Sequence, residues 1–162
     1  MTSMTVQFFD DPELAARASH LIEGDTTQTP TLLDAAIVTW QPDDRRPEAW
    51  QVPLWGSQQT LSGAFWGMLF AHLFLIPLSH DESGSPRHRP PDRSLDHLGL
   101  PECRLAEIRS HVRPGRSALF VLHEHGPAEP WMSTTPAIHV IRFRPVEARR
   151  LYAGFGHQQP DA

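Results

Sequence analysis

The sequence predicts an α+β fold: a ferredoxin-like antiparallel sheet with helices on one face and an apolar helix inserted between the third strand and the second helix. The main observation is the order of the segments, which read strand, helix, strand, strand, insertion, helix, strand and a further strand. The second observation is that these strands carry apolar residues on both faces. A length of 162 residues fits a single domain, 1–162, with the apolar insertion at about 61–78 and a polar loop at about 79–95.

The first half of the chain supplies a strand, a helix and a hairpin. Val6–Phe9 is a short strand candidate. Asp11 is typical of a helix N-cap, a proline follows it, and apolar residues at helical spacing continue to Gly24. Leu33–Trp40 is rich in β-branched and aromatic residues, and Ala49–Trp55 can return antiparallel to it across a mostly polar loop.

The second half of the chain supplies a helix and two strands. Pro101–Val112 is predicted to be helical and to stop at the Pro-Gly pair that follows. Ser117–His123 is the clearest strand of the sequence, and Ile138–Phe143 is predicted to be another. Val146–Tyr152 is expected to form a short terminal helix.

The strands are apolar on both sides of the predicted sheet. Ala118, Phe120 and Leu122 point to one face, while Leu119 and Val121 point to the other. An antiparallel sheet with one wet face would instead alternate apolar and polar residues. The two predicted helices cover one face, so a further apolar element is expected to cover the second.

The segment that suits this role is Gln51–Leu78, 28 residues without Asp, Glu, Lys or Arg. Its second part reads GAFWGMLFAHLFLIPL, and the small residues Gly63, Gly67 and Ala71 recur in it every four positions. Small residues at that spacing let helices approach closely. A helix over Leu61–Leu78 would be about 27 Å long, slightly less than the roughly 30 Å hydrocarbon core of a membrane.

A single membrane crossing by this segment is excluded if the strands before and after it belong to one sheet. We therefore expect the helix to pack on the second sheet face or against a partner subunit, with membrane contact as the alternative. The residues expected to make an interface or membrane contact are the following: Gly63, Phe65, Trp66, Gly67, Phe70, Ala71 and Phe74.

The apolar run and the later LGLPECRLAEIRSHVRPGRSALFVL together resemble the bacterial "predicted membrane protein" family, domain of unknown function 1269. The matching positions are Gly63–Gly67 and Pro114–Leu122, and the upstream Asp34–Val38 also fits. Family members usually continue into a second glycine- and alanine-rich apolar half, where this chain has SHDESGSPRHRPPDRS. The resemblance implies a fold and no catalytic residues.

The chain contains ten histidines, and some of them are candidates for metal ligands. His123 and His125 end a predicted strand and point to the same face, and His139 can join them if the last two strands pair. Three imidazoles can bind zinc, copper or iron. The alternative is that they are exposed strand-end residues without a metal. His72, within the apolar segment, is expected to be a core histidine bonded to a backbone carbonyl.

Composition and motifs exclude several classes of function. A formal net charge of −5 argues against a nucleic-acid-binding protein. The single cysteine, Cys103, excludes an internal disulfide and a multi-cysteine metal site. No Gly-x-Ser-x-Gly elbow, phosphate loop or dinucleotide fingerprint occurs, so we expect a protein that is not an enzyme and needs no cofactor.

The function predicted first is self-association as a homodimer through the inserted helix. The first alternative is a peripheral membrane protein that uses the same helix together with the arginines and histidine of Arg87–Arg93. The second is a protein that binds a divalent metal or a small ligand at His123, His125 and His139. The chain opens without a leader resembling a signal peptide, so a cytoplasmic or membrane-peripheral location is expected.

Overall fold

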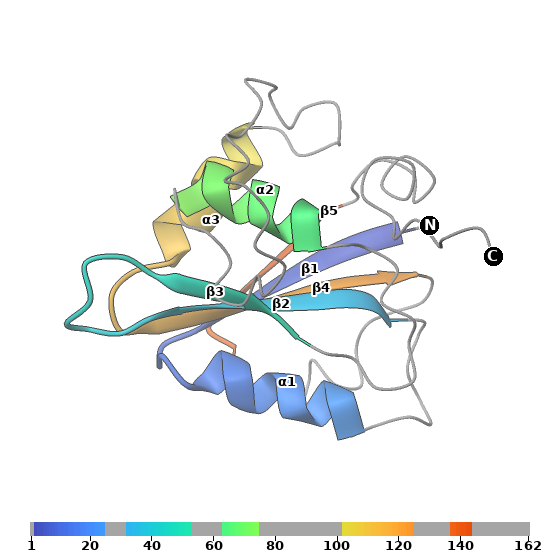
Figure 1. The fold of residues 1–162 in the computed structure, drawn as a ribbon, viewed down its shortest axis with the longest axis horizontal. Helices are drawn as coiled ribbons and strands as arrows, with labels where there is room; N and C mark the ends of the chain where they lie inside the picture. The colour runs from blue at the N-terminus through green and yellow to red at the C-terminus, as the bar shows by residue number, and fades with distance from the viewer. Residues whose placement is uncertain (1, 25–31, 53–62, 75–101, 125–136, 144–162) are drawn as a thin grey trace.

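The computed structural model describes residues 2–24, 32–52, 63–74, 102–124 and 137–143, and within them five strands form one antiparallel sheet in the order β3-β2-β4-β1-β5 (Figure 1). The elements in chain order are β1 (Thr2–Phe9), α1 (Leu14–Gly24), β2 (Leu32–Trp40), β3 (Glu48–Gln51), α2 (Gly63–Phe74), α3 (Glu102–His111), β4 (Arg116–Glu124) and β5 (His139–Phe143). The predicted α+β class is confirmed, and so is the position of the inserted helix between the third strand and the second predicted helix.

The ends of the elements follow the capping signals of the sequence. A side-chain oxygen of Asp11 accepts a hydrogen bond of 2.7 Å from the backbone N–H of Glu13, as expected of an N-cap. After α3, Gly115 adopts a φ of 83°, a left-handed conformation that favours glycine, and its N–H donates to the carbonyl of Trp40 at 2.7 Å. The predicted polar loop at 79–95 and the predicted terminal helix at 146–152 lie outside the described residues.

The strand connections contain the split β-α-β unit of ferredoxin-like folds. β1 and β2 each pair antiparallel with β4, so they run parallel to one another with β4 between them. β5 pairs with the other side of β1, and β3 pairs with the other side of β2. The last strand, β5, is therefore separated from β4 by β1, so His139 of β5 and His123 of β4 are not on neighbouring strands.

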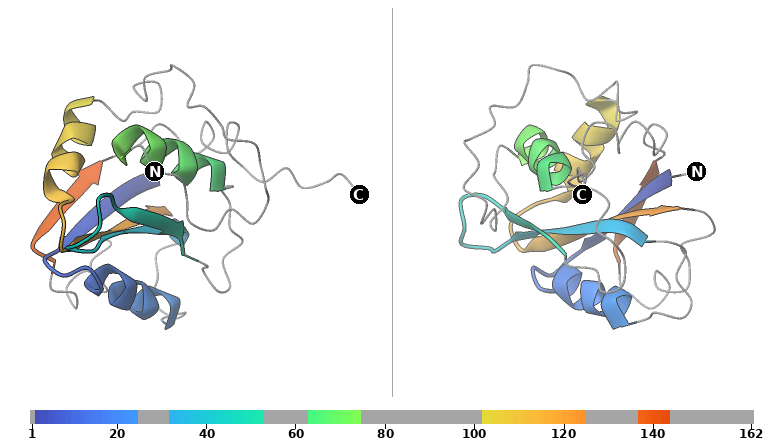
Figure 2. Two further views of the ribbon diagram at one scale, coloured as in Figure 1. Left: turned by 60° about the vertical axis from the view of Figure 1, so that its left-hand side comes forward. Right: turned by 45° about the vertical axis from the view of Figure 1, so that its right-hand side comes forward.

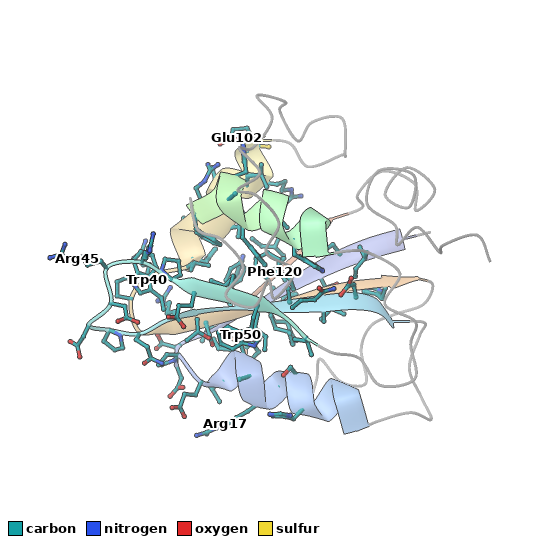
Figure 3. The ribbon with its side chains drawn as sticks, viewed as in Figure 1. Arg17, Trp40, Arg45, Trp50, Glu102 and Phe120 are labelled. Atoms are coloured by element: carbon teal, nitrogen blue, oxygen red, sulfur yellow. The ribbon has the colours of Figure 1, made fainter. Side chains whose placement is uncertain are left out.

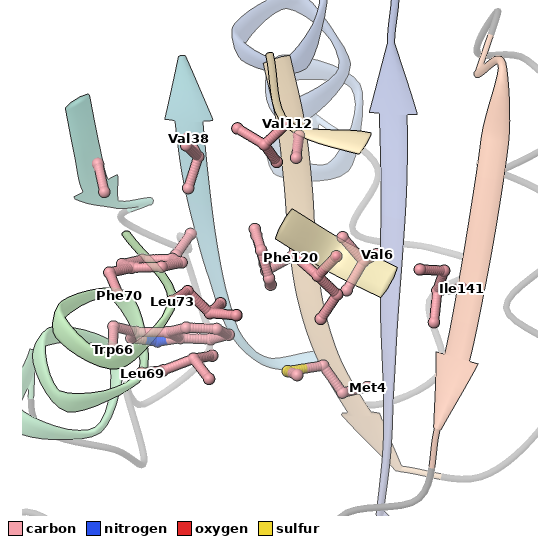
Figure 4. Packing of buried hydrophobic residues seen from close by; sticks show 14 of the residues in the cluster. Met4, Val6, Val38, Trp66, Leu69, Phe70, Leu73, Val112, Phe120 and Ile141 are labelled. Carbon is pink, nitrogen blue, oxygen red and sulfur yellow. The ribbon is translucent and has the colours of Figure 1, made fainter. Parts of the chain in front are cut away.

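Apolar side chains cover both faces of the sheet, as predicted. On one face, Met4, Val6 and Phe8 of β1 belong to a core shared with α2 and α3 (Figure 4). On the other face, Ala15 and Ala18 of α1 pack against β1, β2 and β4. The two further views show the sheet between α1 on one side and the α2–α3 pair on the other (Figure 2).

The distribution of the helices differs from the prediction, which placed the first and second predicted helices on the same face. α3 instead lies beside α2, on the face opposite α1. The width of the sheet allows this arrangement. Five strands at about 4.8 Å spacing span about 19 Å, and packed helices lie roughly 8–10 Å apart, so one face has room for two helices side by side.

The apolar helix α2 is part of the protein's own core. Its 12 residues span about 18 Å, and Trp66, Leu69, Phe70 and Leu73 are buried against the sheet. Phe70 contacts the ring of Phe120 edge to face, with centroids 5.1 Å apart. Among the described residues, no helix combines the length and the apolar character that a membrane crossing needs.

We predict that Phe70→Ala lowers the free energy of unfolding by about 3–5 kcal/mol, because it leaves a cavity beneath α2. Urea denaturation followed by circular dichroism measures this loss. Phe74→Ala, on the same helix but only half-buried, is the matched control and should cost clearly less. Equal losses for the two variants would contradict the described packing of α2.

Candidate metal centre

Two histidines and one glutamate come together where α3 passes over β5. Glu107 and His111 are four residues apart on α3 and therefore project from neighbouring turns of one side of the helix. His139 is the first residue of β5 and lies opposite Phe8 of β1 in the strand register. One donor atom from each of Glu107, His111 and His139 lies within 4.8 Å of the other two, and all three residues are half-buried.

The two imidazole rings are held by stacking. The centroids of His111 and His139 lie 4.1 Å apart, and the ring planes differ by 19°. The buried ring of Phe8 lies 4.9 Å from the His111 ring and 6.0 Å from the His139 ring. Packing on the buried Phe8 side chain limits the rotation of both imidazoles, and because each nitrogen lone pair lies in its ring plane, the two rings must turn apart before both can bind one ion.

The gap between His139 and Glu107 has the size expected for a shared ion. The Nε2 atom of His139 is buried and makes no hydrogen bond within the described part of the chain. It lies 3.6 Å from Oε1 of Glu107, which is too far for an N–H···O hydrogen bond. Two donors that each lie about 2.1 Å from a tetrahedral metal ion are about 3.4 Å apart.

Glu107 is oriented by a neighbour on its own helix. Arg104 donates a hydrogen bond of 3.2 Å from Nη1 to Oε2 of Glu107. Both side chains are partly exposed, so this pair contributes little to stability. Arg104 binds the Oε2 atom of Glu107, while the Oε1 atom of Glu107 faces His139.

The surroundings of His111 favour its neutral form. Burial lowers the pKa of His111 below its ordinary value, and the neighbouring His139 lowers the pKa further. Glu107 raises this pKa, whereas Arg116 and Arg113 lower it. A neutral imidazole keeps a lone pair on one ring nitrogen, which is the form that binds a metal.

The structure does not bring the predicted histidine trio together. His123 lies opposite Ser3 in β1, whereas His139 lies opposite Phe8, so about 17 Å of strand separates them. The two histidines also lie on opposite faces of the sheet, because positions 3 and 8 differ by an odd number. His123 is buried, with Nε2 3.1 Å from Oγ1 of Thr5. The condition under which His139 was expected to join His123, that their two strands pair, is not met, because β5 pairs with β1 and not with β4.

The third member of the predicted trio, His125, lies outside the described residues. Glu107 and His111 were not predicted as candidates. Their signal was nevertheless present in the sequence, as a Glu and a His four residues apart on a predicted helix.

The predicted contact residues of α2 divide into two groups. Trp66 and Phe70 are fully buried in the protein's own core, which leaves them unavailable to a partner or a lipid. Gly67, Ala71 and Phe74 are half-buried. Gly63 begins α2 and Phe65 follows in its first turn, but their side chains are outside what the structure describes.

The opposite side of α3 is tied to α2 through polar groups. Nε2 of His72 lies 3.3 Å from one carboxylate oxygen of Glu102, at the outer end of α3 (Figure 3). Arg109 donates to the other oxygen at 2.6 Å and also to the backbone carbonyl of Leu73 at 3.2 Å. The hydrogen bonds from Arg109 and His72 lower the pKa of Glu102. His72 therefore contacts a carboxylate where the two helices meet, and is not the carbonyl-bonded core histidine that was expected.

Comparisons with known proteins give one match. The model of a family described as "Protein of unknown function (DUF1269)" matches residues 60–142, a range that contains Glu107, His111 and His139. No curated protein and no solved structure matches the chain.

We predict that His111 in metal-free protein titrates with a pKa below 6.5. The unfolded chain then binds this proton more tightly than the folded protein does. The stability contributed by His111 is complete above pH 6.5 and is lost as the pH falls through the folded pKa.

Histidine proton shifts in NMR spectra measure this pKa. His139→Gln should raise the pKa of His111, because it removes a neighbouring positive charge. Arg45→Gln, in the β2–β3 hairpin, should leave it unchanged (Figure 3). A value at or above 6.5 in the unmodified protein would contradict the description of this site.

Proposed function

Since the chain belongs to the DUF1269 family of proteins of unknown function, we propose a function from its own side chains. The proposed function is the binding of one divalent transition-metal ion through Glu107, His111 and His139. One observation carries the proposal. A buried imidazole nitrogen of His139 faces a carboxylate oxygen of Glu107 at 3.6 Å, without a hydrogen bond among the described residues. Ring stacking alone explains the position of the imidazoles, but it does not explain a buried nitrogen that lies beside a carboxylate oxygen without a hydrogen bond to it.

The donor set indicates the class of metal. Two imidazoles and one carboxylate suit zinc and the neighbouring first-row ions, whereas magnesium and calcium prefer oxygen ligands throughout. The 3.6 Å separation is close to the value expected around a tetrahedral ion. We therefore propose Zn²⁺ as the first ion to test.

The position of the cluster also predicts a consequence for stability. The donors come from α3 and β5, so a bound ion would link the helix to a strand that pairs with β1 alone among the described strands. An ion that binds the folded protein and not the unfolded chain stabilises it by about 2.7 kcal/mol at a concentration one hundred times Kd.

Isothermal titration of tag-free, metal-free protein with Zn²⁺ tests the proposal, together with thermal unfolding with and without the ion. We expect one ion per chain and a higher Tm in its presence. Glu107→Gln and His139→Gln should each weaken binding at least about tenfold, because each removes a ligand. Only the unmodified protein should then gain the full increase in Tm.

The matched control is His72→Gln, which also removes a histidine beside a glutamate but away from the cluster. Its Zn²⁺ affinity should equal that of the unmodified protein. The proposal fails if no ion binds, or if Glu107→Gln and His139→Gln bind Zn²⁺ as tightly as the unmodified chain does.

Self-association through α2 is the second candidate function. What supports it is the half-buried flank formed by Gly67, Ala71 and Phe74, on the other side of the helix from His72 and its contact with α3. This flank is narrower than the contact that the sequence predicted, because Trp66 belongs to the core. Contact of the same flank with a membrane surface is the remaining alternative.

Sedimentation velocity at micromolar concentrations tests the dimer. We expect Ala71→Asp to shift the protein to a monomer, since a charge at a helix contact must be desolvated. Ala106→Asp, at an exposed position of α3, is the control and should leave the dimer intact. An unmodified chain that sediments as a monomer would end this candidate, and binding of the monomer to anionic vesicles would favour the membrane alternative.

A further inference from the structure

We infer that the metal ion at Glu107, His111 and His139 keeps a coordination position for a small oxyanion, with a carboxylate as the simplest ligand of this class. The inference rests on the proposed metal binding. It adds to that proposal the chemical class of a second ligand that the site would take.

The first argument is the number of donors. The described residues supply three, each through one atom, whereas a tetrahedral ion takes four ligands. Arg104 binds Oε2 of Glu107, so this carboxylate offers one oxygen to the ion and not two. A fourth position is therefore left for a ligand from outside the cluster.

The second argument is access from solvent. The side chains of Glu107 and His139 are 36% and 39% exposed, although the Nε2 atom between them is buried. Zinc sites that serve only structure are closed by four protein ligands, whereas sites that exchange a ligand keep one position open. Because both side chains are partly exposed, solvent reaches the rim of the cluster at the edge of the sheet, as in the second kind of site, even though Nε2 of His139 itself is buried.

The third argument is charge. One carboxylate against a divalent ion leaves the centre with a net positive charge, and imidazoles add none when neutral. Arg104 lies against Glu107, and the guanidinium groups of Arg113 and Arg116 act electrostatically on His111. Arg116 is paired with Asp10, whereas Arg113 uses its Nε to donate to the carbonyl of Ser110. The positive charge of the loaded centre is therefore the main feature that favours an anion, and Arg113 and Arg116 add to it.

Visible spectroscopy of the Co²⁺-loaded protein tests the inference, because Co²⁺ takes the same kinds of ligands as Zn²⁺ and its absorption reports the coordination sphere. The full-length, tag-free chain with one equivalent of Co²⁺ is titrated with sodium acetate at constant ionic strength, set with perchlorate. We expect a saturable change in absorption at one acetate per ion, reversed when acetate is removed.

Arg113→Gln separates the role of charge from that of the metal ligands. It should leave Co²⁺ affinity the same or slightly higher, since Arg113 disfavours positive charge at His111, and weaken acetate binding about two- to fivefold, the range that a partly exposed charge supplies. Arg45→Gln, in the distant β2–β3 hairpin, is the matched control and should leave both affinities unchanged.

The outcomes distinguish this inference from the proposed function. If Co²⁺ binds and its absorption does not respond to acetate, a fourth protein ligand closes the site; the inference is then overturned while metal binding stands. If Co²⁺ does not bind at all, both are overturned. An acetate response that persists unchanged in Glu107→Gln would also overturn the inference, because the anion would then be binding elsewhere.

Discussion

Burial of both faces of one sheet determines where every described helix lies. The strands carry apolar residues on each side, with Phe120 directed to one face and Leu119 to the other, and leaving either side in water would lose the hydrophobic free energy that stabilises the fold. α1 covers part of one face. The opposite face has room for two helices, and α3 packs beside α2 on it, toward β1 and β5. The position of α3 is thus a result of sheet coverage, and it is this position that brings Glu107 and His111 beside His139.

The side chains of α3 show how a single short helix serves three environments. Leu105 and Ile108 are buried on the sheet. Arg109 contacts α2 on one side, and Glu107 faces His139 of β5 on the other. Because successive residues turn by about 100°, ten residues are enough to place the apolar side chains, the contact with α2 and the pair Glu107 and His111 on separate sides. The polar cluster at β5 is therefore compatible with a helix that is held mainly by its apolar contacts.

Local patterns in the sequence were sufficient to predict the helices and strands, but not to predict which strands lie side by side. The N-cap at Asp11 and the turn at Gly115 could be read directly, since capping depends on residues close in the chain. Strand pairing depends on the whole sheet, and alternation reveals which face a residue occupies without naming the strand beside it. For that reason the sequence leaves open whether His139 lies beside His123, and the register places it opposite Phe8. The apolar run of α2 favoured packing on the sheet or on a partner, with a membrane as the alternative, and the burial of Trp66 shows that part of it lies in the core.

Arg109 connects α3 to α2, and its position on α3 also relates this contact to the cluster at β5. Its guanidinium holds both Glu102 on α3 and the carbonyl of Leu73 in the last turn of α2. It also lies two residues from Glu107 and two from His111 on the same rigid helix. Any rotation of α3 about its axis that draws those two side chains toward an ion must therefore move Arg109 relative to α2. The contact with α2 and the cluster at β5 therefore share one short helix, so a shift of α3 at either contact would change the geometry of the other.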